Sequence, residues 1–179
     1  MSNTPDTLIA LGYEARRAGK LEDAKQHFAD AVELCHGTPD QALLARSLTG
    51  LGQIERDLKN TVQALQHYEK AASIYRSSPD PLRFAHTIRH VGDILRNEGS
   101  VARARPCYEE ALAIYRDHNE TPHLDLANAI RGFALLEGDA GNTEQAMSLW
   151  QEARRLYYAA NVQPGVEGCD VQIQRLATK

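Results

Sequence analysis

Apolar and small residues recur along this chain at the spacing of helix faces. Four segments share an alanine, an aromatic residue four positions later and a second alanine three positions after that: Ala24, Phe28 and Ala31; Ala64, Tyr68 and Ala71; Ala104, Tyr108 and Ala111; Ala146, Trp150 and Ala153. Successive aromatic residues are 40, 40 and 42 positions apart. Residues three or four apart share one face of a helix, so each set forms a stripe with a large side chain between two small ones. The pattern predicts four helices that pack through these stripes.

A second apolar pattern precedes each stripe. Its members are Leu8, Leu11 and Gly12; Leu48, Leu51 and Gly52; Ile88, Val91 and Gly92; Ile130, Phe133 and Ala134. Each repeat is therefore predicted to contain two helices. A glycine inside a helix costs about 1 kcal/mol relative to alanine, so its recurrence at one position indicates a close helix crossing. Gly132 also follows Gly92 by 40 residues, but that alignment places Arg131 at an apolar position, and we interpret the spacing of Gly132 as a coincidence.

Polar residues mark the ends of the predicted helices. Hydroxyl residues that precede a proline are predicted to cap the first helices of the repeats; they are Thr4, Thr38, Ser78 and Thr121. Asn60 with Gln63 and Asn142 with Gln145 resemble capping boxes of the second helices. The short turns between paired helices require the two helices to run antiparallel.

Nine helices and no strands are predicted from these signals. They span residues 5–18, 21–36, 39–58, 61–76, 79–98, 101–117, 122–140, 143–160 and 165–177. The last helix carries one apolar stripe, formed by Val166, Cys169, Ile173 and Leu176. Such an amphipathic helix is expected to cover the end of the last repeat.

Composition excludes several other classes of protein. The chain has 179 residues, of which 42% are hydrophobic and 25% charged, and this balance is typical neither of a disordered chain nor of a membrane protein. The first residues, MSNTPDT, lack the features of a signal peptide, and we expect a cytoplasmic location. The three cysteines contain no Cys-x-x-Cys pair, so neither a disulfide framework nor a zinc site is predicted. No cofactor is expected.

The combined pattern resembles the tetratricopeptide repeat over nearly the whole chain. The usual period of that family is 34 residues, and the spacing here is closer to the 40 to 42 residue variant found in kinesin light chain and several bacterial regulators. The resemblance implies an all-α, right-handed solenoid of four helix-turn-helix repeats with a C-terminal capping helix. It would form one domain over residues 1–179, with repeats at about 5–38, 39–78, 79–121 and 122–163 and the capping helix at 164–179.

The resemblance also implies that the first helices line a concave groove that binds a peptide or a partner segment. Carried over by repeat position, the groove residues are Tyr13, Arg16, Arg17, Arg46, Gln53, Arg56, His86, Arg89, His90, Asp93, Arg96, Asn97, Asn128 and Arg131. Seven arginines fall on this face together with four aspartates, Asp6, Asp57, Asp93 and Asp139, although the net charge is −4. One hypothesis is that the arginines bind an acidic segment or a terminal carboxylate. The alternative is that they pair with Asp57, Asp93 and neighbouring carboxylates as a solvated surface.

The residues give little support for a carboxylate clamp, a metal site, an enzyme or a nucleic-acid-binding protein. The carboxylate clamp of chaperone-binding relatives is absent, because Ile9, Tyr13, Gly50, His86 and His90 occupy the matching positions. His86 and His90 have the spacing of two metal ligands, but without a His-Glu-x-x-His pattern, and a solvated pair is the preferred interpretation. Without nucleotide-binding or hydrolase motifs we expect no enzymatic activity, and the acidic net charge argues against nucleic-acid binding.

The competing function is a homo-oligomeric scaffold that associates through its solenoid surface or its terminal helix. Tyr75, Tyr115 and Tyr157 recur near the ends of three second helices. We predict that they contact the first helix of the following repeat. An exposed row of tyrosines on the outer face would instead favour self-association.

Overall fold

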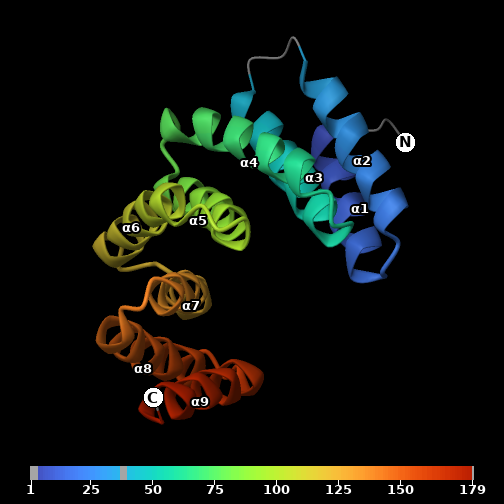
Figure 1. The fold of residues 1–179 in the computed structure, drawn as a ribbon. Helices are drawn as coiled ribbons and strands as arrows, with labels where there is room; N and C mark the ends of the chain where they lie inside the picture. Colours follow the sequence, from blue (N-terminus) through green and yellow to red (C-terminus); the bar gives the residue numbers. More distant parts are fainter. Residues whose placement is uncertain (1–3, 37–39, 179) are drawn as a thin grey trace. The chain divides into compact units, whose positions relative to one another are not determined.

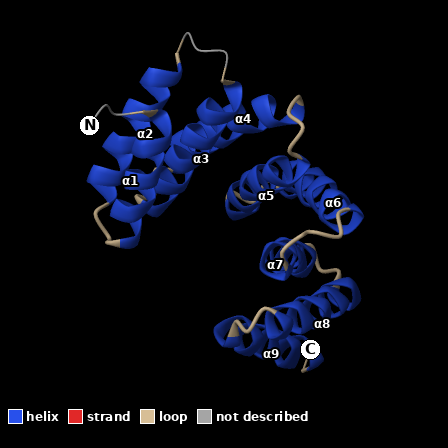
Figure 2. Cartoon of the chain, turned by 180° about the vertical axis from the view of Figure 1, so that it is seen from behind, coloured by secondary structure: helices blue, strands red, loops and turns tan. Residues whose placement is uncertain are grey.

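The computed structural model describes residues 4–36 and 40–178 (Figure 1). Within these ranges it contains nine helices and no strand (Figure 2). They are α1 (Pro5–Arg17), α2 (Leu21–Cys35), α3 (Gln41–Asp57), α4 (Thr61–Arg76), α5 (Pro81–Asn97), α6 (Val101–Asp117), α7 (His123–Asp139), α8 (Thr143–Ala159) and α9 (Gln163–Ala177). The predicted all-α fold of paired helices is confirmed, and each boundary lies within two residues of the predicted one.

The first helices of the four pairs end in the same way. The residue two positions before each second helix has a positive φ: 75° at Gly19, 68° at Lys59, 75° at Gly99 and 84° at Gly141. At the first of these turns, the Gly19 N–H donates to the Arg16 carbonyl and the Lys20 N–H to the Ala15 carbonyl, at 3.0 and 2.9 Å. These are the two bonds of a Schellman motif, which satisfies the last helical carbonyls and reverses the chain.

Helix capping differs from the prediction at several positions. Thr4 caps α1 as expected, because its hydroxyl accepts from the Thr7 N–H. In α3 the capping side chain is Asp40, whose Oδ1 accepts from the Leu43 N–H at 3.1 Å; Thr38 and Pro39 lie outside the described residues. Asp80 accepts from the Arg83 N–H at 3.1 Å in the same way. At the starts of α3 and α5, an aspartate carboxylate therefore accepts a hydrogen bond from the backbone N–H three residues later, where a hydroxyl cap was predicted.

Two further capping predictions were wrong. The Thr121 hydroxyl is buried and has no hydrogen-bond partner among the described residues, and α7 begins after Pro122 without a side-chain cap. Asn60 and Asn142 make no side-chain capping bond either. Both asparagines turn their side-chain amides toward a glutamate in the preceding first helix.

Contacts divide the chain into two compact units, Met1–Thr87 and Ile88–Lys179, and each is described by itself. The prediction of a single domain over residues 1–179 stays a prediction. Unit 1 contains α1 to α4 and the first turns of α5, and unit 2 contains the rest of α5 and α6 to α9.

The core of unit 1 is centred on Phe28, which is completely buried. Its ring meets Tyr13 edge to face with a centroid distance of 5.0 Å. A Cβ atom added to Gly12 would lie 2.8 Å from the ring, and one added to Gly50 would lie closer still. Gly12 belongs to the same repeat as Phe28 and Gly50 to the next. The aromatic side chain therefore fits between two first helices only because both present glycine.

Unit 2 repeats this arrangement around the fully buried Tyr108. A Cβ atom on Gly92 would lie 3.2 Å from the ring, and one on Gly132 would lie 2.6 Å from it. Gly132 follows Gly50 by 82 residues, which is two repeats. Gly132 is therefore the equivalent of Gly50 and not of Gly92, in agreement with the alignment that places Ala134 opposite Gly92. Both units thus use glycine at two kinds of repeat position, one facing the aromatic residue of the same repeat and one facing that of the preceding repeat.

Each unit also buries a glutamate at the equivalent position. In unit 1, Glu55 lies 2.9 Å from the Lys25 Nζ and accepts from the Asn60 amide at 2.7 Å. In unit 2, Glu137 is fully buried and accepts from the Asn142 amide at 2.6 Å. Arg105 of α6 makes a bidentate pair with Glu137. Each asparagine thus satisfies a buried carboxylate that ties two consecutive repeats together.

Helix α9 packs on the last repeat, as predicted. Val166 and Cys169 are buried, and Ile173 and Leu176 are half-buried. A Cβ atom on Gly165 would lie 2.5 Å from the Tyr157 ring, so α9 closely approaches the end of α8.

Candidate partner-binding surface

The predicted surface of unit 1 lies on α1 and α3, which polar side chains connect. Arg16 Nε lies 2.7 Å from Asp57 Oδ2, and its Nη1 donates to Gln53 Oε1 at 3.1 Å. Arg46 Nη1 lies 3.0 Å from Asp6 Oδ1. The structure therefore brings these predicted residues of two consecutive repeats together. Gln53 is buried beneath them.

Three arginine side chains lie near the hydroxyl of Tyr13 in α1. Burial raises the pKa of the Tyr13 hydroxyl, and the charges of Arg46, Arg83 and Arg16 oppose that rise. Arg83 lies in the first turn of α5 and was not predicted as a surface residue. Its proximity depends on how α5 meets the preceding repeat, which no local sequence signal indicates.

Arginines exceed carboxylates on this face of unit 1. The predicted arginines are Arg16, Arg17, Arg46 and Arg56. Asp6 pairs with Arg46, and Asp57 pairs with Arg16 and lies 3.7 Å from Arg56. Arg17 is exposed, and no ion pair between described residues involves it.

Three predicted residues of unit 2 form an interior cluster. Arg89 and His90 are 6% and 5% exposed. Arg89 donates to Asp93 Oδ2 at 2.8 Å and lies 2.8 Å from the His90 ring, and the Tyr108 hydroxyl donates to Asp93 Oδ1 at 2.7 Å. Burial by itself would raise the pKa of Asp93, but hydrogen bonding from His90 and the charge of Arg89 hold that pKa well below its usual range. Arg89 and His90 therefore contribute to the interior of unit 2 rather than to an open surface.

The other predicted residues of unit 2 are more accessible. Arg96 lies 3.3 Å from Asp139 Oδ2 and donates to the exposed Asn97 at 2.7 Å. Asn128 of α7 is half-buried and accepts from the Tyr157 hydroxyl at 2.7 Å. Arg131, one helical turn later, is exposed. His86 is half-buried and belongs to unit 1.

The recurring tyrosines lie in the interior. Tyr75, Tyr115 and Tyr157 are at most 3% exposed. Burial raises the pKa of Tyr115 and Tyr157. Tyr157 contacts the capping helix α9 through its ring and α7 of its own repeat through its hydroxyl. An exposed tyrosine row is therefore excluded as a surface for self-association.

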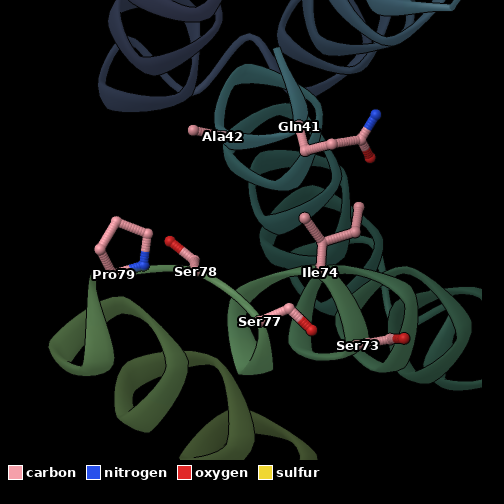
Figure 3. A pocket seen from close by; sticks show the side chains of 7 residues that line it. All are labelled: Gln41, Ala42, Ser73, Ile74, Ser77, Ser78 and Pro79. Atoms are coloured by element: carbon pink, nitrogen blue, oxygen red, sulfur yellow. The ribbon is translucent and has the colours of Figure 1, made fainter. Parts of the chain in front are cut away.

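A separate cavity of about 370 Å³ lies in unit 1, between the start of α3 and the end of α4 (Figure 3). Its lining consists of Gln41, Ala42, Ser73, Ile74, Ser77, Ser78 and Pro79. None of the predicted surface residues belongs to this lining, and it carries no charged side chain. The cavity is therefore distinct from the arginine-bearing face.

Two general properties bear on the kind of site. No group of three or more His, Cys, Asp or Glu side chains within residues 4–36 and 40–178 is arranged to hold a metal ion. Among the helices described, none is both long and apolar enough to cross a membrane.

Comparison with known families agrees with the helix pairs. The model of the tetratricopeptide repeat matches residues 3–77 and 83–159. This chain belongs to the tetratricopeptide repeat family. Proteins of this family are typically non-catalytic, and membership supports a role as a protein–protein interaction module. The assignment to a 40 to 42 residue variant stays a prediction. No curated protein sequence matches the chain.

Several solved structures share the fold. BtubC (BKLC) from P. vanneervenii is 15% identical with a TM-score of 0.73, over 97% of this chain and 79% of that one. Aspartyl phosphate phosphatase F from Bacillus subtilis is 14% identical with a TM-score of 0.82, over 95% and 45%. A Rap protein complexed with Competence and Sporulation Factor is 16% identical with a TM-score of 0.79, over 96% and 48%. The tetratricopeptide repeat chain thus spans less than half the length of the last two, and at these identities the likeness concerns the fold.

Proposed function

We propose that this tetratricopeptide repeat protein is a non-catalytic module that binds an acidic segment of a protein partner on the first-helix faces. The observation that supports this best is the positive charge near Tyr13 in unit 1. Arg16, Arg46 and Arg83 act on the Tyr13 hydroxyl, and Arg83 also pairs with Asp80 at 2.9 Å. A guanidinium group presents planar, forked donors that match a carboxylate.

The internal ion pairs of this face leave room for a partner. In the pair between Arg46 and Asp6, the side chains are 33% and 62% exposed. Such solvated pairs contribute about 0–1 kcal/mol each, so exchanging an internal carboxylate for one of a partner costs little. Arg89 and Asp93 differ, with side chains only 7% and 18% exposed and further hydrogen bonds to their neighbours. The proposed binding residues are therefore the accessible ones of each unit taken by itself: Arg16, Arg17, Arg46 and Arg56 in unit 1, and Arg96, Asn97, Asn128 and Arg131 in unit 2.

Affinity capture with matched charge variants tests the proposal. The test variant combines Arg17→Gln, Arg46→Gln and Arg56→Gln on the first helices. The control combines Lys70→Gln, Arg103→Gln and Arg155→Gln, which remove the same charge from exposed positions on second helices. Proteins captured from the native lysate are identified by mass spectrometry, after circular dichroism has shown both variants to be folded. We expect the control to retain a partner that the test variant loses; identical partner sets would contradict the proposal.

Self-association is the second candidate function. Tyr158 at the end of α8 is 73% exposed and Val171 on α9 is 61% exposed, which makes both available to a second copy. Sedimentation over a range of concentrations distinguishes the candidates. A mass that rises with concentration in the wild type and stays monomeric in a Tyr158→Gln, Val171→Gln variant would support self-association, and a constant monomer mass would exclude it.

A further inference from the structure

Two arginines at equivalent repeat positions in unit 2 have opposite environments. Arg89 and Arg131 each precede a buried tyrosine, Tyr115 or Tyr157, by 26 residues. Arg89 is buried and forms its ion pair with the residue four positions later, Asp93. The residue four positions after Arg131 is Leu135. Since residues four apart share one face of a helix, the substitution of leucine for aspartate removes the carboxylate that would neutralise Arg131.

Arg131 forms no ion pair within the part of the chain that the structure describes. It is exposed, and none of the ion pairs between described residues includes it. Asp125 lies in the first turn of the same helix, but burial raises the pKa of its carboxyl group and Arg89 is the cation that opposes this rise. Arg131 therefore carries an exposed charge that no ion pair between described residues neutralises; the nearby Asp170, which acts with Arg131 on Cys169, pairs with Arg154 instead.

The Tyr157 hydroxyl interacts with both Asn128 and Arg131. Burial raises the pKa of Tyr157, and the charge of Arg131 is the largest influence that opposes it, so the guanidinium lies near the hydroxyl. The Tyr157 hydroxyl also donates to Asn128 Oδ1 at 2.7 Å. This bond orients the Asn128 side chain through its oxygen and does not involve the Asn128 NH₂ group. Asn128 and Arg131 are three positions apart and share one face of α7. Two donor groups are thus held side by side on one accessible helix face.

We infer that Arg131 is a carboxylate subsite, which binds an aspartate or glutamate side chain of the partner segment beside the amide of Asn128. The inference rests on the proposed binding of an acidic segment and assigns it one point of attachment in unit 2. Arg96 is a weaker choice, since its side chain is 18% exposed and already pairs with Asp139.

The comparison between Arg89 and Arg131 provides the test. Leu135→Asp would recreate beside Arg131 the carboxylate that Asp93 provides for Arg89, and would compete internally with the partner. Leu135→Asn changes the same half-buried position without adding charge. Arg131→Gln removes the cation directly. Arg155→Gln, at an exposed position on α8, removes an equal charge away from the first helices.

Binding is measured by fluorescence polarisation with two labelled probes. One is a peptide of alternating glutamate and glycine, and the other has glutamine in place of glutamate. We expect wild type to prefer the glutamate probe. Arg131→Gln and Leu135→Asp should each weaken its binding about tenfold, the loss of one charge-assisted contact. Leu135→Asn and Arg155→Gln should bind within about twofold of wild type, since both retain Arg131 without adding a carboxylate.

The outcomes separate the subsite from the proposed function. Wild type that prefers glutamate, together with an Arg131→Gln variant that binds equally well, would overturn the subsite and leave the proposed function standing. Wild type without any preference for glutamate would overturn both. If Leu135→Asp fails to fold, as judged by circular dichroism, Arg131→Gln at the exposed position decides the question.

Discussion

Glu137 and Arg105 allow the cost of an unpaired buried charge to be measured in this chain. Glu137 is completely buried, and Arg105 of α6 reaches it across the boundary between two repeats with a side chain that is 32% exposed. We predict that Arg105→Leu strongly destabilises unit 2, because it leaves the carboxylate with only the Asn142 amide as a side-chain partner.

The magnitude follows from the burial of the two partners. Removal of one partner from a fully buried ion pair costs about 3–5 kcal/mol. Arg105 is partly solvated, so we expect the lower end, about 3 kcal/mol. The double variant Arg105→Leu, Glu137→Leu should recover most of this loss, because a buried pair gains little over apolar side chains of similar size. The chain itself carries Leu65 and Leu95 at the equivalent positions of the second and third repeats.

Urea denaturation followed by tryptophan fluorescence provides the assay. Trp150 is the only tryptophan of the chain, lies in unit 2 and is 4% exposed, so its emission reports the unfolding of that unit. Arg116→Leu is the control, because Arg116 and Glu152 form an ion pair whose side chains are 50% and 32% exposed. This substitution should lower the free energy of unfolding by less than about 1 kcal/mol. A double variant as unstable as Arg105→Leu would refute the reasoning, as would a single variant no less stable than the control.

Two further predictions concern close packing and pH. Gly132→Ala should destabilise unit 2 by about 2 kcal/mol, because its Cβ atom would lie 2.6 Å from the ring of the buried Tyr108. Gly138→Ala, in the same helix with no neighbour within 4 Å, should instead stabilise it by about 0.5 kcal/mol through helix propensity; Trp150 emission in urea measures both, and equal effects would contradict the packing argument. The second prediction is that folding stability falls in acid. Asp93 and Glu55 have folded-state pKa values below the usual ones, so their contribution is present above the unfolded pKa values, about 4, and is lost as pH falls through the folded values. Asp93→Asn should flatten the pH dependence of unit 2 below about pH 4, and an unchanged profile would show that Asp93 contributes nothing.

The helices, their pairing and the family could all be predicted from the amino-acid pattern. These features depend on local interactions, because the 3.6-residue period, the glycine turns and the stripes around Phe28, Tyr68, Tyr108 and Trp150 act within one or two adjacent helices. The family resemblance followed from the same residues, and the match to the tetratricopeptide repeat confirmed it.

Which polar residues are internal became clear from the packing of the helices. Arg89 and Arg131 are equivalent in the repeat, but one is buried against Asp93 and the other is exposed beside Leu135. The repeat pattern assigned no role to Gly132, and the structure shows that it makes room for Tyr108 of the preceding repeat. Asn142 resembled a helix cap, but its amide binds Glu137. In each case the deciding partner comes from another turn or another helix, and the competition between burial, ion pairing and capping is settled only when the helices pack together.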